Sequence, residues 1–376
     1  RYFADQQMDS VMIPVDIAPE AVADYLLALR GWLNMSGVLV TVPHKQRAAT
    51  LVDELTPRAR HLNAVNVIRK LADGRLQGDM LDGVGFSLAA AAHGFQPEGK
   101  SALLSGCGGV GSAIVDQLRD TGVSVRATCR HPDIQRWPWA ETVVSDLDRP
   151  HTLRPALRGV DAVFLYSFAQ LDALDRLAAE MRNAGVRKVV VLSTIDTTRT
   201  EAFVEYNKQR HLAVESAMQD CGFVTVCLRP GAFARNAIRF WADQIRLCRQ
   251  VRLPFPDSQQ APIADEDIAA VAVRALTSQQ LDGQKIVLTG PHSLTMREQV
   301  RAISRAIGQP VDVIEIADAE ARALYGRILP PKYLELLMAQ WAFEQTEPAA
   351  VTDAVERITG RPATTYSDWA TRHTDA

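Results

Sequence analysis

The sequence predicts an α/β protein with a doubly wound parallel sheet, preceded by an α/β substrate-binding lobe and followed by a smaller α/β lobe. Three observations predict this class. From residue 101 onward, short apolar segments alternate regularly with helical patterns. A glycine-rich turn directly follows the first of those segments. Before residue 101, strand-like and helix-like runs alternate in a less regular order, which indicates a separate unit.

Composition and charge narrow the possible partners. The chain has 376 residues, of which 47% are hydrophobic and 23% charged, and its net charge is −3. Such a chain is long enough for two or three domains, and no positive field would attract nucleic acid or an anionic membrane. The five cysteines form no CxxC pair or metal-ligand spacing, so we expect reduced thiols and no metal. We therefore expect a cytoplasmic protein that acts on a small molecule, with a homodimer as the candidate oligomer.

Residues 1–98 are predicted to form the substrate-binding lobe. A proline near the start of a helix and an Asp-Gly turn between two strands support the assignment of its elements. We expect strands at 10–17 and 37–42, helices at 19–32, 43–55 and 82–95, and a strand pair within 63–80 around Asp73-Gly74. The segment 93–100, rich in glycine and proline, is the predicted linker.

Residues 99–230 are predicted to form the sheet domain. Its apolar strands are short and are mostly separated by helical patterns, as in βαβ units. The expected strands are 101–106, 124–130, 141–146, 161–167, 188–193 and 223–231. Residues 231–376 are predicted to form the C-terminal lobe, with mainly helices and two short strands at 284–290 and 311–316.

The glycine-rich turn predicts a dinucleotide site. Gly106, Gly108 and Gly111 have GxGxxG spacing after a strand and at the start of a helix, with Gly109 and Val110 between them. The first glycine permits the turn, the second lets the backbone approach pyrophosphate, and the third lets helix and strand pack closely. The helix N-terminus favours phosphate. This pattern in this context indicates a Rossmann domain.

The end of the next strand indicates which dinucleotide is bound. NAD enzymes usually have a carboxylate there for the ribose hydroxyls. This chain has Arg130 in the sequence "TCRHPD", and a guanidinium is suited to a 2′-phosphate. We therefore predict NADP as the cofactor.

Three motifs before the linker carry a family resemblance. They are "VTVPHK" (40–45), "AVN" (64–66) and "GDMLDGVGF" (78–86). In their order and spacing they resemble the substrate domain of shikimate dehydrogenase. The resemblance implies that Lys45 and Asp82 form the catalytic pair and that Thr41 and Asn66 hydrogen-bond the substrate.

The chemistry of that pair is consistent with carbonyl reduction. A developing alkoxide needs a proton donor, and a lysine near a helix N-terminus has its charged form disfavoured. The sequence also departs from the family. The family's first strand and its paired serines have no counterpart, and Met80-Leu81 replace its Asn-Thr. We therefore expect a more apolar pocket and a different or larger substrate.

From the glycine turn onward, the chain resembles NmrA-like proteins, a branch of the atypical short-chain dehydrogenases/reductases. The matching segments include "SDLDRPHTLRPALRGVDAVFL", "RHLAVESAMQDCGFVTVCLRPGAFARN" and "ADEDIAAVAVRAL". The resemblance implies that Asp146 and Leu147 lie near the adenine and that Pro230 borders the nicotinamide. Ser167, at the end of its strand, completes the cofactor residues that we expect.

The short-chain Tyr-x-x-x-Lys signature is altered. When the chain is aligned on Glu215, the lysine slot holds His211 and the tyrosine slot holds Asn207. His211 is therefore a candidate acid or substrate-orienting residue, and a structural histidine is the equal alternative.

The leading functional hypothesis is an NADP-dependent oxidoreductase. Hydride would move between nicotinamide and a carbonyl, enone or imine of a small cyclic or acidic metabolite, with Lys45 and Asp82 as the proton relay. One alternative is a redox sensor that binds dinucleotide without turnover, as some NmrA-like proteins do. Another is a reductase that works from the His211 cleft, with the N-terminal lobe as a lid.

Overall fold

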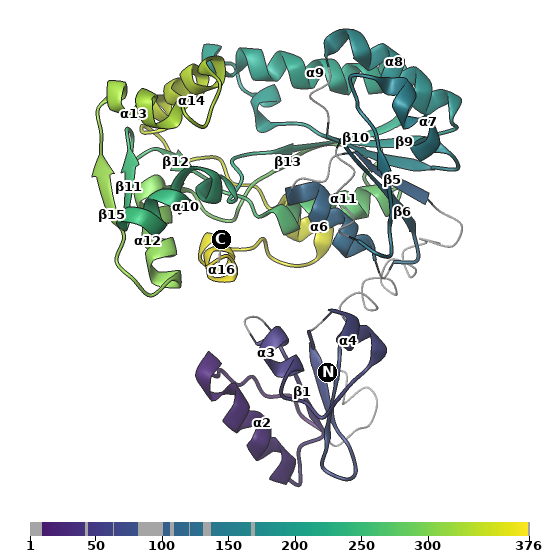
Figure 1. The fold of residues 1–376 in the computed structure, drawn as a ribbon, viewed down its shortest axis with the longest axis vertical. Coiled ribbons are helices and arrows are strands. Elements are labelled where there is room, and N and C mark those ends of the chain that lie inside the picture. Colours follow the sequence, from purple (N-terminus) through teal and green to yellow (C-terminus); the bar gives the residue numbers. More distant parts are fainter. Residues whose placement is uncertain are drawn as a thin grey trace. The chain divides into compact units, whose positions relative to one another are not determined.

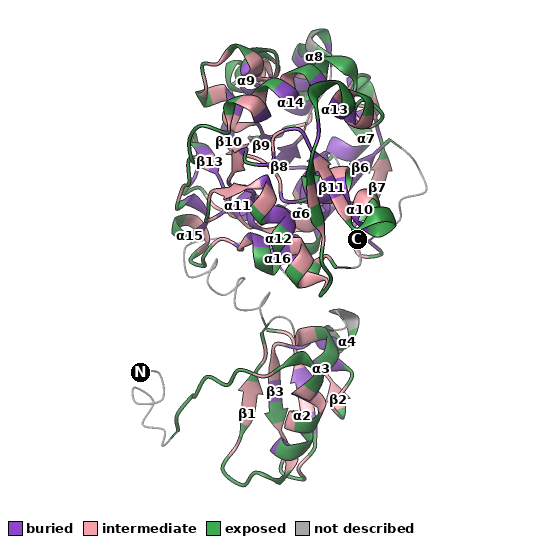
Figure 2. Ribbon diagram, turned by 90° about the vertical axis from the view of Figure 1, so that its left-hand side faces the viewer, coloured by how far each residue is buried: buried purple, intermediate pink, exposed green. Residues whose placement is uncertain are grey.

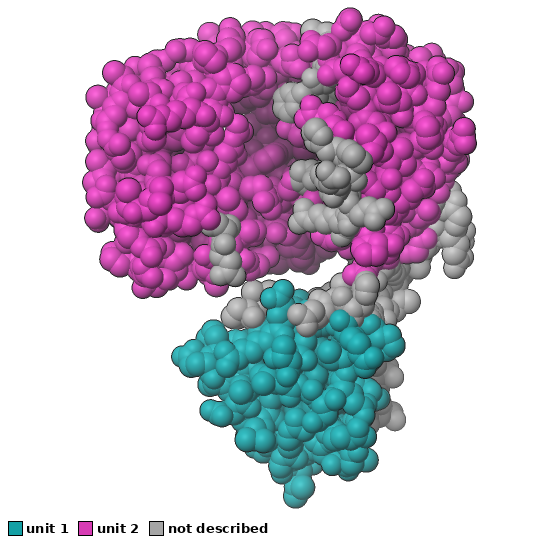
Figure 3. Space-filling model, in the orientation of Figure 1, with its two compact units in different colours: residues 1–86 teal, residues 87–376 magenta. Residues whose placement is uncertain are grey.

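The computed structural model describes residues 10–41, 44–62, 64–81, 101–105, 109–119, 121–130, 137–166 and 170–374. The chain divides into two compact units, residues 1–86 and 87–376 (Figure 3). Asp82, Gly106, Gly108, Ser167 and the predicted linker 93–100 lie outside the described residues. Within the described part of the chain, no helix is long and apolar enough to cross a membrane.

The first unit contains a four-stranded sheet in the order β1-β3-β4-β2. β1 and β3 pair antiparallel, as do β3 and β4, and β2 joins β4 in parallel. Its apolar core includes Leu26 and Leu29 from the first α-helix and Ile68 and Leu76 from the sheet. The elements are η1 (Pro19–Ala21), α2 (Val22–Gly31), β1 (Gly37–Leu39), α3 (Lys45–Ala49), β2 (Glu54–Leu55), α4 (Pro57–Leu62), β3 (Val67–Lys70) and β4 (Leu76–Asp79).

Two elements of this unit differ from the sequence prediction. Residues 10–17 form no strand, and Val11, Met12 and Ile13 are exposed despite their β propensity. The helix expected at 43–55 ends at Ala49, and β2 follows it. A contact with another strand explains why β2 replaces the end of the expected helix. The Asp53 carboxylate accepts from the backbone N–H of Leu76 at 2.7 Å, which holds this segment against β4.

The second unit is built on a seven-stranded sheet in the order β13-β10-β9-β8-β5-β6-β7 (Figure 1). Every neighbouring pair in this sheet is parallel. The order reverses between β5 and β8, and this is where doubly wound sheets bind ligands. The strands are β5 (Ser101–Ser105), β6 (Ser124–Cys129), β7 (Glu141–Val144), β8 (Ala162–Leu165), β9 (Lys188–Leu192), β10 (Val224–Pro230) and β13 (Lys285–Leu288). The predicted Rossmann sheet is confirmed.

Helices cover both faces of this sheet, and the strands between them are largely buried (Figure 2). α6 (Gly109–Leu118) and α11 (Asp265–Thr277) pack together on one face. The other face is covered by η2 (Pro150–Leu153), α7 (Arg154–Leu157), α8 (Leu171–Asn183) and α9 (Glu205–Asp220). Two 3-10 helices, η3 (Ile195–Thr198) and η4 (Ala202–Val204), connect β9 to α9.

The rest of the second unit forms the C-terminal lobe around its own apolar core. The strand expected at 284–290 does not belong to this lobe, because β13 pairs in parallel with β10 and extends the main sheet. The strand expected at 311–316 is β15, which pairs with β11. The lobe elements are α10 (Asn236–Cys248), β11 (Gln250–Leu253), β12 (Gln259–Gln260), β14 (Leu294–Thr295), α12 (Met296–Ala306), β15 (Asp312–Glu315), α13 (Asp318–Tyr325), α14 (Pro331–Phe343) and α16 (Tyr366–Arg372). α15 (Ala354–Thr359) packs instead against α11 and β13 of the main sheet.

Candidate active site

Two adjoining pockets lie at the carboxyl ends of the parallel strands. The first, called the loop pocket, has a volume of about 150 Å³ and is lined by residues that include Gly109, Val110, Gly111, Arg235 and Asp265. The second, called the lobe pocket, has a volume of about 270 Å³ and extends towards the C-terminal lobe. Tyr166, Leu192 and Phe233 line both pockets, so the two spaces are neighbours.

The loop pocket has the features of a phosphate cradle. α6 begins at Gly109, four residues after β5 ends at Ser105, so the N–H groups of its first turn lie at the carboxyl edge of the sheet. A side chain at Gly109 would collide with the Asp265 carboxylate and the Arg235 guanidinium, which form an ion pair. A larger residue here would therefore have to displace this ion pair. This arrangement fits the pyrophosphate of a dinucleotide.

The predicted cofactor residues further along the sheet edge occupy strand ends. Arg130 is exposed and directly follows β6. Asp146 follows β7, and its carboxylate accepts from the N–H of Asp148 at 3.1 Å. Leu147 packs against the apolar core on the α8 face. Pro230 ends β10 and lines the lobe pocket.

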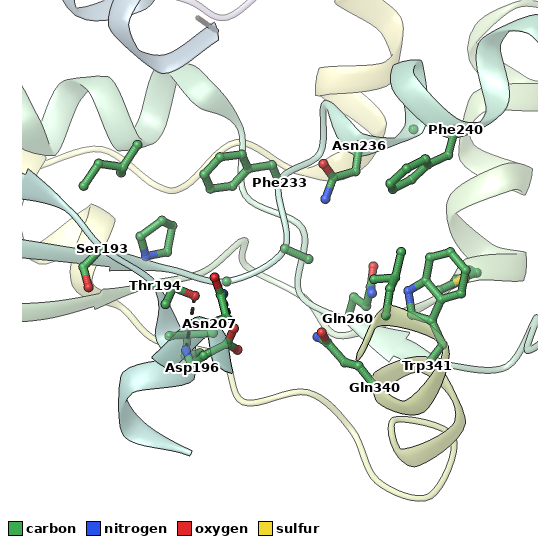
Figure 4. Close-up of a pocket in the computed structure, with 18 of the residues that line it drawn as sticks. Ser193, Thr194, Asp196, Asn207, Phe233, Asn236, Phe240, Gln260, Gln340 and Trp341 are labelled. Atoms are coloured by element: carbon green, nitrogen blue, oxygen red, sulfur yellow. Dashed lines mark hydrogen bonds between the residues drawn. The ribbon is translucent and has the colours of Figure 1, made fainter. Parts of the chain in front are cut away.

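The lobe pocket combines aromatic rings with amide side chains (Figure 4). The rings come from the segments after β8 and β10 and from α10 and α14, and the amides come from α9, α10, β12, α12 and α14. The aromatic residues are Tyr166, Phe233, Phe240, Trp241 and Trp341, and the amides are Asn207, Asn236, Gln260, Gln299 and Gln340. Such a lining is suited to a planar molecule with a few hydrogen-bonding groups.

A carboxyl group and an amide meet in this pocket. Asp196 lies on η3, just past the end of β9, and Asn207 lies on the first turn of α9. The Asn207 Nδ2 donates to Asp196 Oδ2 at 2.6 Å. Asp196 is 8% exposed, and its burial raises the pKa of the carboxyl group, which the hydrogen bond from Asn207 partly counteracts.

His211 lines the same pocket one helical turn after Asn207. It is 6% exposed, and burial lowers its pKa to about 4, so the ring is neutral near pH 7. Glu215, one turn further on, pairs with Arg229 at 2.6 Å. The altered Tyr-x-x-x-Lys positions therefore face the pocket, but they present an amide and a neutral imidazole.

In the first unit, backbone hydrogen bonds bring three of the predicted residues together. The Val65 N–H donates to the Lys45 carbonyl at 3.0 Å, and the Val40 N–H donates to the Asn66 carbonyl at 2.8 Å. Thr41 directly follows Val40 and is exposed. The Asn66 Oδ1 accepts from the N–H of Leu81 at 2.7 Å, one residue before Asp82. Lys45 and Asn66 thus lie on adjacent segments of one unit.

Comparisons with known proteins agree with this architecture. A family model described as NAD(P)H-binding matches residues 106–279, and one described as shikimate dehydrogenase substrate binding domain matches residues 1–68. The chain is 34% identical over 273 residues to a (4-alkanoyl-5-oxo-2,5-dihydrofuran-3-yl)methyl phosphate reductase of Streptomyces griseus, covering 72% of this chain and 96% of that protein. It is 30% identical over 287 residues to an NAD(P)H azoreductase of Xenophilus azovorans, covering 73% of this chain and 98% of that protein.

The chain therefore belongs to the NAD(P)H-dependent, NmrA-like reductases and carries a shikimate dehydrogenase-type substrate domain at its N-terminus. The N-terminal relationship is partial. A shikimate dehydrogenase of Rubrobacter xylanophilus is 39% identical over 122 residues, and that match spans 43% of the relative's length. Both predicted resemblances are thus confirmed, as is the prediction of an oxidoreductase.

Solved structures confirm the fold of the second unit. The Escherichia coli quinone oxidoreductase in complex with NADPH aligns with a TM-score of 0.61 at 19% identity, covering 72% of this chain and 99% of that one. The Citrobacter triphenylmethane reductase in complex with NADP(H) aligns with a TM-score of 0.60 at 15% identity, covering 73% and 99%.

Several residues of the lobe pocket were not predicted from the sequence. Asp196, the aromatic residues of α10 and the aromatic and amide side chains of β12 and α14 come from segments without a motif. The position of Asp196 could have identified it as a site residue. It lies four residues after β9, at the carboxyl edge of the parallel sheet, where doubly wound folds bind ligands. Asn207 was identified as the occupant of the tyrosine slot, but not as a pocket residue.

Proposed function

We propose that this chain is an NADP-dependent reductase that transfers hydride from NADPH to a carbonyl, enone or imine carbon of a small cyclic molecule held in the lobe pocket. The observation that carries the proposal is the junction of the two pockets at Tyr166, Leu192 and Phe233. A dinucleotide whose pyrophosphate lies at Gly109–Gly111 extends along this sheet edge in doubly wound folds. Its nicotinamide would then meet a substrate at the junction.

The chain's own residues would bind and orient the reactants. Gly109, Val110 and Gly111 would hold the pyrophosphate, together with Gly106 and Gly108 of the same motif, which lie outside the described residues. Arg130 would pair with the 2′-phosphate, Asp146 and Leu147 would border the adenine, and Ser167 and Pro230 would border the nicotinamide. His211, being neutral, would hydrogen-bond and orient the substrate. The bound cofactor supplies the hydride, and the pocket walls exclude water.

The names of the relatives support reduction of the substrate by NADPH as the direction of the reaction. Both of the most extensively matching relatives quoted above are reductases, and their names specify a dihydrofuranone phosphate and, through the term azoreductase, an azo compound. Both are conjugated acceptors of hydride. We infer the same reaction class here without transferring either substrate.

The test offers the full chain NADPH and a panel of cyclic enones, ketones and imines. The loss of NADPH absorbance measures turnover. We expect turnover with at least one class and a higher kcat/KM with NADPH than with NADH. NADPH binding without turnover of any class would instead support the redox-sensor alternative. The absence of NADPH binding would contradict the proposed cofactor.

A second candidate mechanism assigns proton transfer to Lys45 and Asp82. The observation that favours it is the convergence of Lys45 and Asn66 on adjacent segments of a unit that matches the shikimate dehydrogenase domain. If this relay operates, Lys45→Met and Lys45→Arg should each lower kcat about a hundredfold or more, since arginine does not release its proton. Arg47→Met, an exposed change on the same short helix α3, is the control. Unchanged kcat in both Lys45 variants would exclude the relay and leave the lobe-pocket reductase intact.

A further inference from the structure

The charged side chains of the lobe pocket are unequally distributed. Among the described residues that line it, Asp196 is the one acidic side chain, and none is lysine or arginine. The remaining polar lining consists of amides, hydroxyls and the imidazole of His211. A bound anion would therefore meet no compensating charge in this lining, whereas a bound cation would meet a carboxyl group.

The charged groups behind Asp196 largely compensate one another. Arg199, at the end of η3, pairs with both Glu201 and Glu344 at 3.1 Å. On α9, Lys208 donates to the Arg199 carbonyl at 2.8 Å and lies 3.8 Å from Glu205. The positive charge of Arg199 is thus shared by two carboxylates, and its effect in lowering the pKa of Asp196 is smaller than the opposite effect of burial.

The two side chains that hydrogen-bond the Asp196 carboxyl group, Asn207 and Thr194, are both uncharged. Asn207 donates a neutral hydrogen bond, which orients the carboxyl group without adding positive charge. His211 on the next turn is neutral because of its burial. In the short-chain signature, the position of Asn207 holds tyrosine and the position of His211 holds a cationic lysine. Here the carboxyl group of Asp196 is available to pair with a cation on the substrate.

The aromatic walls favour the same kind of ligand. Phe240 and Trp241 come from α10, and Trp341 comes from α14. Figure 4 labels Phe240 and Trp341 among these rings. Aromatic faces attract cations through their quadrupole, and the attraction grows when the cation is desolvated. A pocket that combines a carboxyl group with several rings is suited to a flat organic cation.

We propose that the substrate class of the lobe pocket is a cyclic imine and that Asp196 is the catalytic acid that protonates its nitrogen. This inference rests on the proposed reductase function and specifies its substrate. The Asp196 O–H bond breaks and an N–H bond forms, which leaves an iminium cation paired with the carboxylate. Hydride from NADPH then adds to the C=N carbon, giving an amine and NADP+, and solvent returns a proton to Asp196.

The chemistry favours an imine over a ketone. An imine nitrogen is basic enough to take a proton from a carboxyl group before hydride arrives, whereas a ketone oxygen becomes basic only as the alkoxide forms. Burial raises the pKa of Asp196, so that its protonated form persists to higher pH than that of an exposed aspartate. An aspartic acid held by an amide is thus better matched to an imine than to a ketone.

The first test compares two bicyclic probes with the full-length wild-type protein and NADPH. Dihydroisoquinoline carries the C=N bond, and tetralone is a ketone of similar shape. We expect kcat/KM for the imine to exceed that for the ketone at least tenfold. Reduction of tetralone at an equal or higher kcat/KM would overturn the inference and leave the proposed reductase function standing. Reduction of no carbonyl, enone or imine would count against the proposed function itself.

A binding test needs no variant. Tetrahydroisoquinoline is a cation near neutral pH, and isochroman is its neutral ring-oxygen analogue. Measured in the presence of NADP+, the Kd of the amine should be at least tenfold lower, a difference of about 1.4 kcal/mol. Equal affinities, or tighter binding of isochroman, would contradict the pairing with Asp196.

The variant test removes the proton and the charge of Asp196 while keeping its shape. Asp196→Asn should lower kcat/KM for dihydroisoquinoline at least a hundredfold and abolish the preference for tetrahydroisoquinoline over isochroman, with the Kd for NADPH unchanged. Asp172→Asn is the matched control, because Asp172 lies on α8 with its side chain 80% exposed. Wild-type turnover by Asp196→Asn would refute the catalytic assignment. If this variant fails to fold, the two wild-type comparisons still decide the question.

Discussion

The guanidinium of Arg229 holds Glu215 through two hydrogen bonds, from Nη2 to Oε2 at 2.6 Å and from Nε to Oε1 at 3.0 Å. The Ser193 hydroxyl donates to the same carboxylate at 2.6 Å. Because Glu215 lies on α9, Arg229 on β10 and Ser193 just after β9, these bonds join the helix to two strands of the sheet. They therefore fix the helix face that carries Asn207 and His211.

The first prediction concerns this ion pair. Glu215 is 1% exposed, so Glu215→Gln would leave Arg229 without its principal charge partner in a buried setting. Removing one partner of a buried pair costs about 3–5 kcal/mol, and the more distant Lys285–Glu215 contact at 3.7 Å is lost too. We expect the free energy of unfolding in urea to fall by about 3 kcal/mol. Glu205→Gln, a partly exposed change on the same helix, should alter it by less than about 1 kcal/mol. Equal effects of the two changes would contradict the structural role.

How far the sequence predicted the fold can be judged from particular elements. The alternation of strands and helices from residue 101 onward and the helix that carries Asn207 and His211 follow from local patterns. The structure places Gly109, Pro230 and His211 at one sheet edge. The seventh strand was assigned to the wrong lobe because its short apolar run says nothing about its partner. Only the pairing of β13 with β10 shows this.

The site was less predictable because its walls come from distant segments. Asp196 and Trp341 are separated by 145 positions in the sequence, and they share the lobe pocket only after the C-terminal lobe has packed. The strand predicted at residues 10–17 is wrong for a different reason. Their apolar composition favours a strand, but a strand also needs a paired neighbour, and the structure gives this segment no such pairing.

A second prediction tests the phosphate cradle. A methyl group at Gly109 would collide with Asp265 and Arg235, so Gly109→Ala should displace the start of α6 and raise the Kd for NADPH at least tenfold. Gly31→Ala is the control, because Gly31 ends α2 with nothing within 4 Å of the added methyl group. Titration of NADPH fluorescence would measure both. Tight binding by Gly109→Ala would show that the dinucleotide lies elsewhere.

A third prediction concerns the choice of dinucleotide. A charge-assisted hydrogen bond to phosphate contributes about 1.5–3 kcal/mol, so Arg130→Gln should raise KM for NADPH about tenfold or more. KM for NADH, which lacks the 2′-phosphate, should change little. Arg246→Gln, on α10 with the arginine side chain 61% exposed, should affect neither value. A parallel rise in KM for both cofactors would assign Arg130 a structural role.

The last prediction uses the buried imidazole of His211. Burial lowers its pKa to about 4 in the folded chain, against 6.5 for the exposed group. Because the unfolded chain then binds the proton more readily, the neutral ring costs stability as pH falls from 6.5 towards 4. The full difference between the folded and unfolded pKa values of His211 corresponds to about 3 kcal/mol in the free energy of unfolding. Buried carboxyl groups titrate in the lower part of this window, so the comparison must be between variants.

His211→Asn should therefore lose less stability than the wild type between pH 6.5 and 4.5. Urea unfolding at several pH values would measure the difference, which should approach 2–3 kcal/mol, about 1.36 kcal/mol for each pH unit of the window. His151→Asn, at an exposed position on η2, is the control and should follow the wild-type curve. Parallel curves for all three proteins would mean that His211 accepts a proton in the folded state as easily as in the unfolded chain. The neutral, substrate-orienting role proposed for it in the lobe pocket would then have to be replaced by that of a general acid.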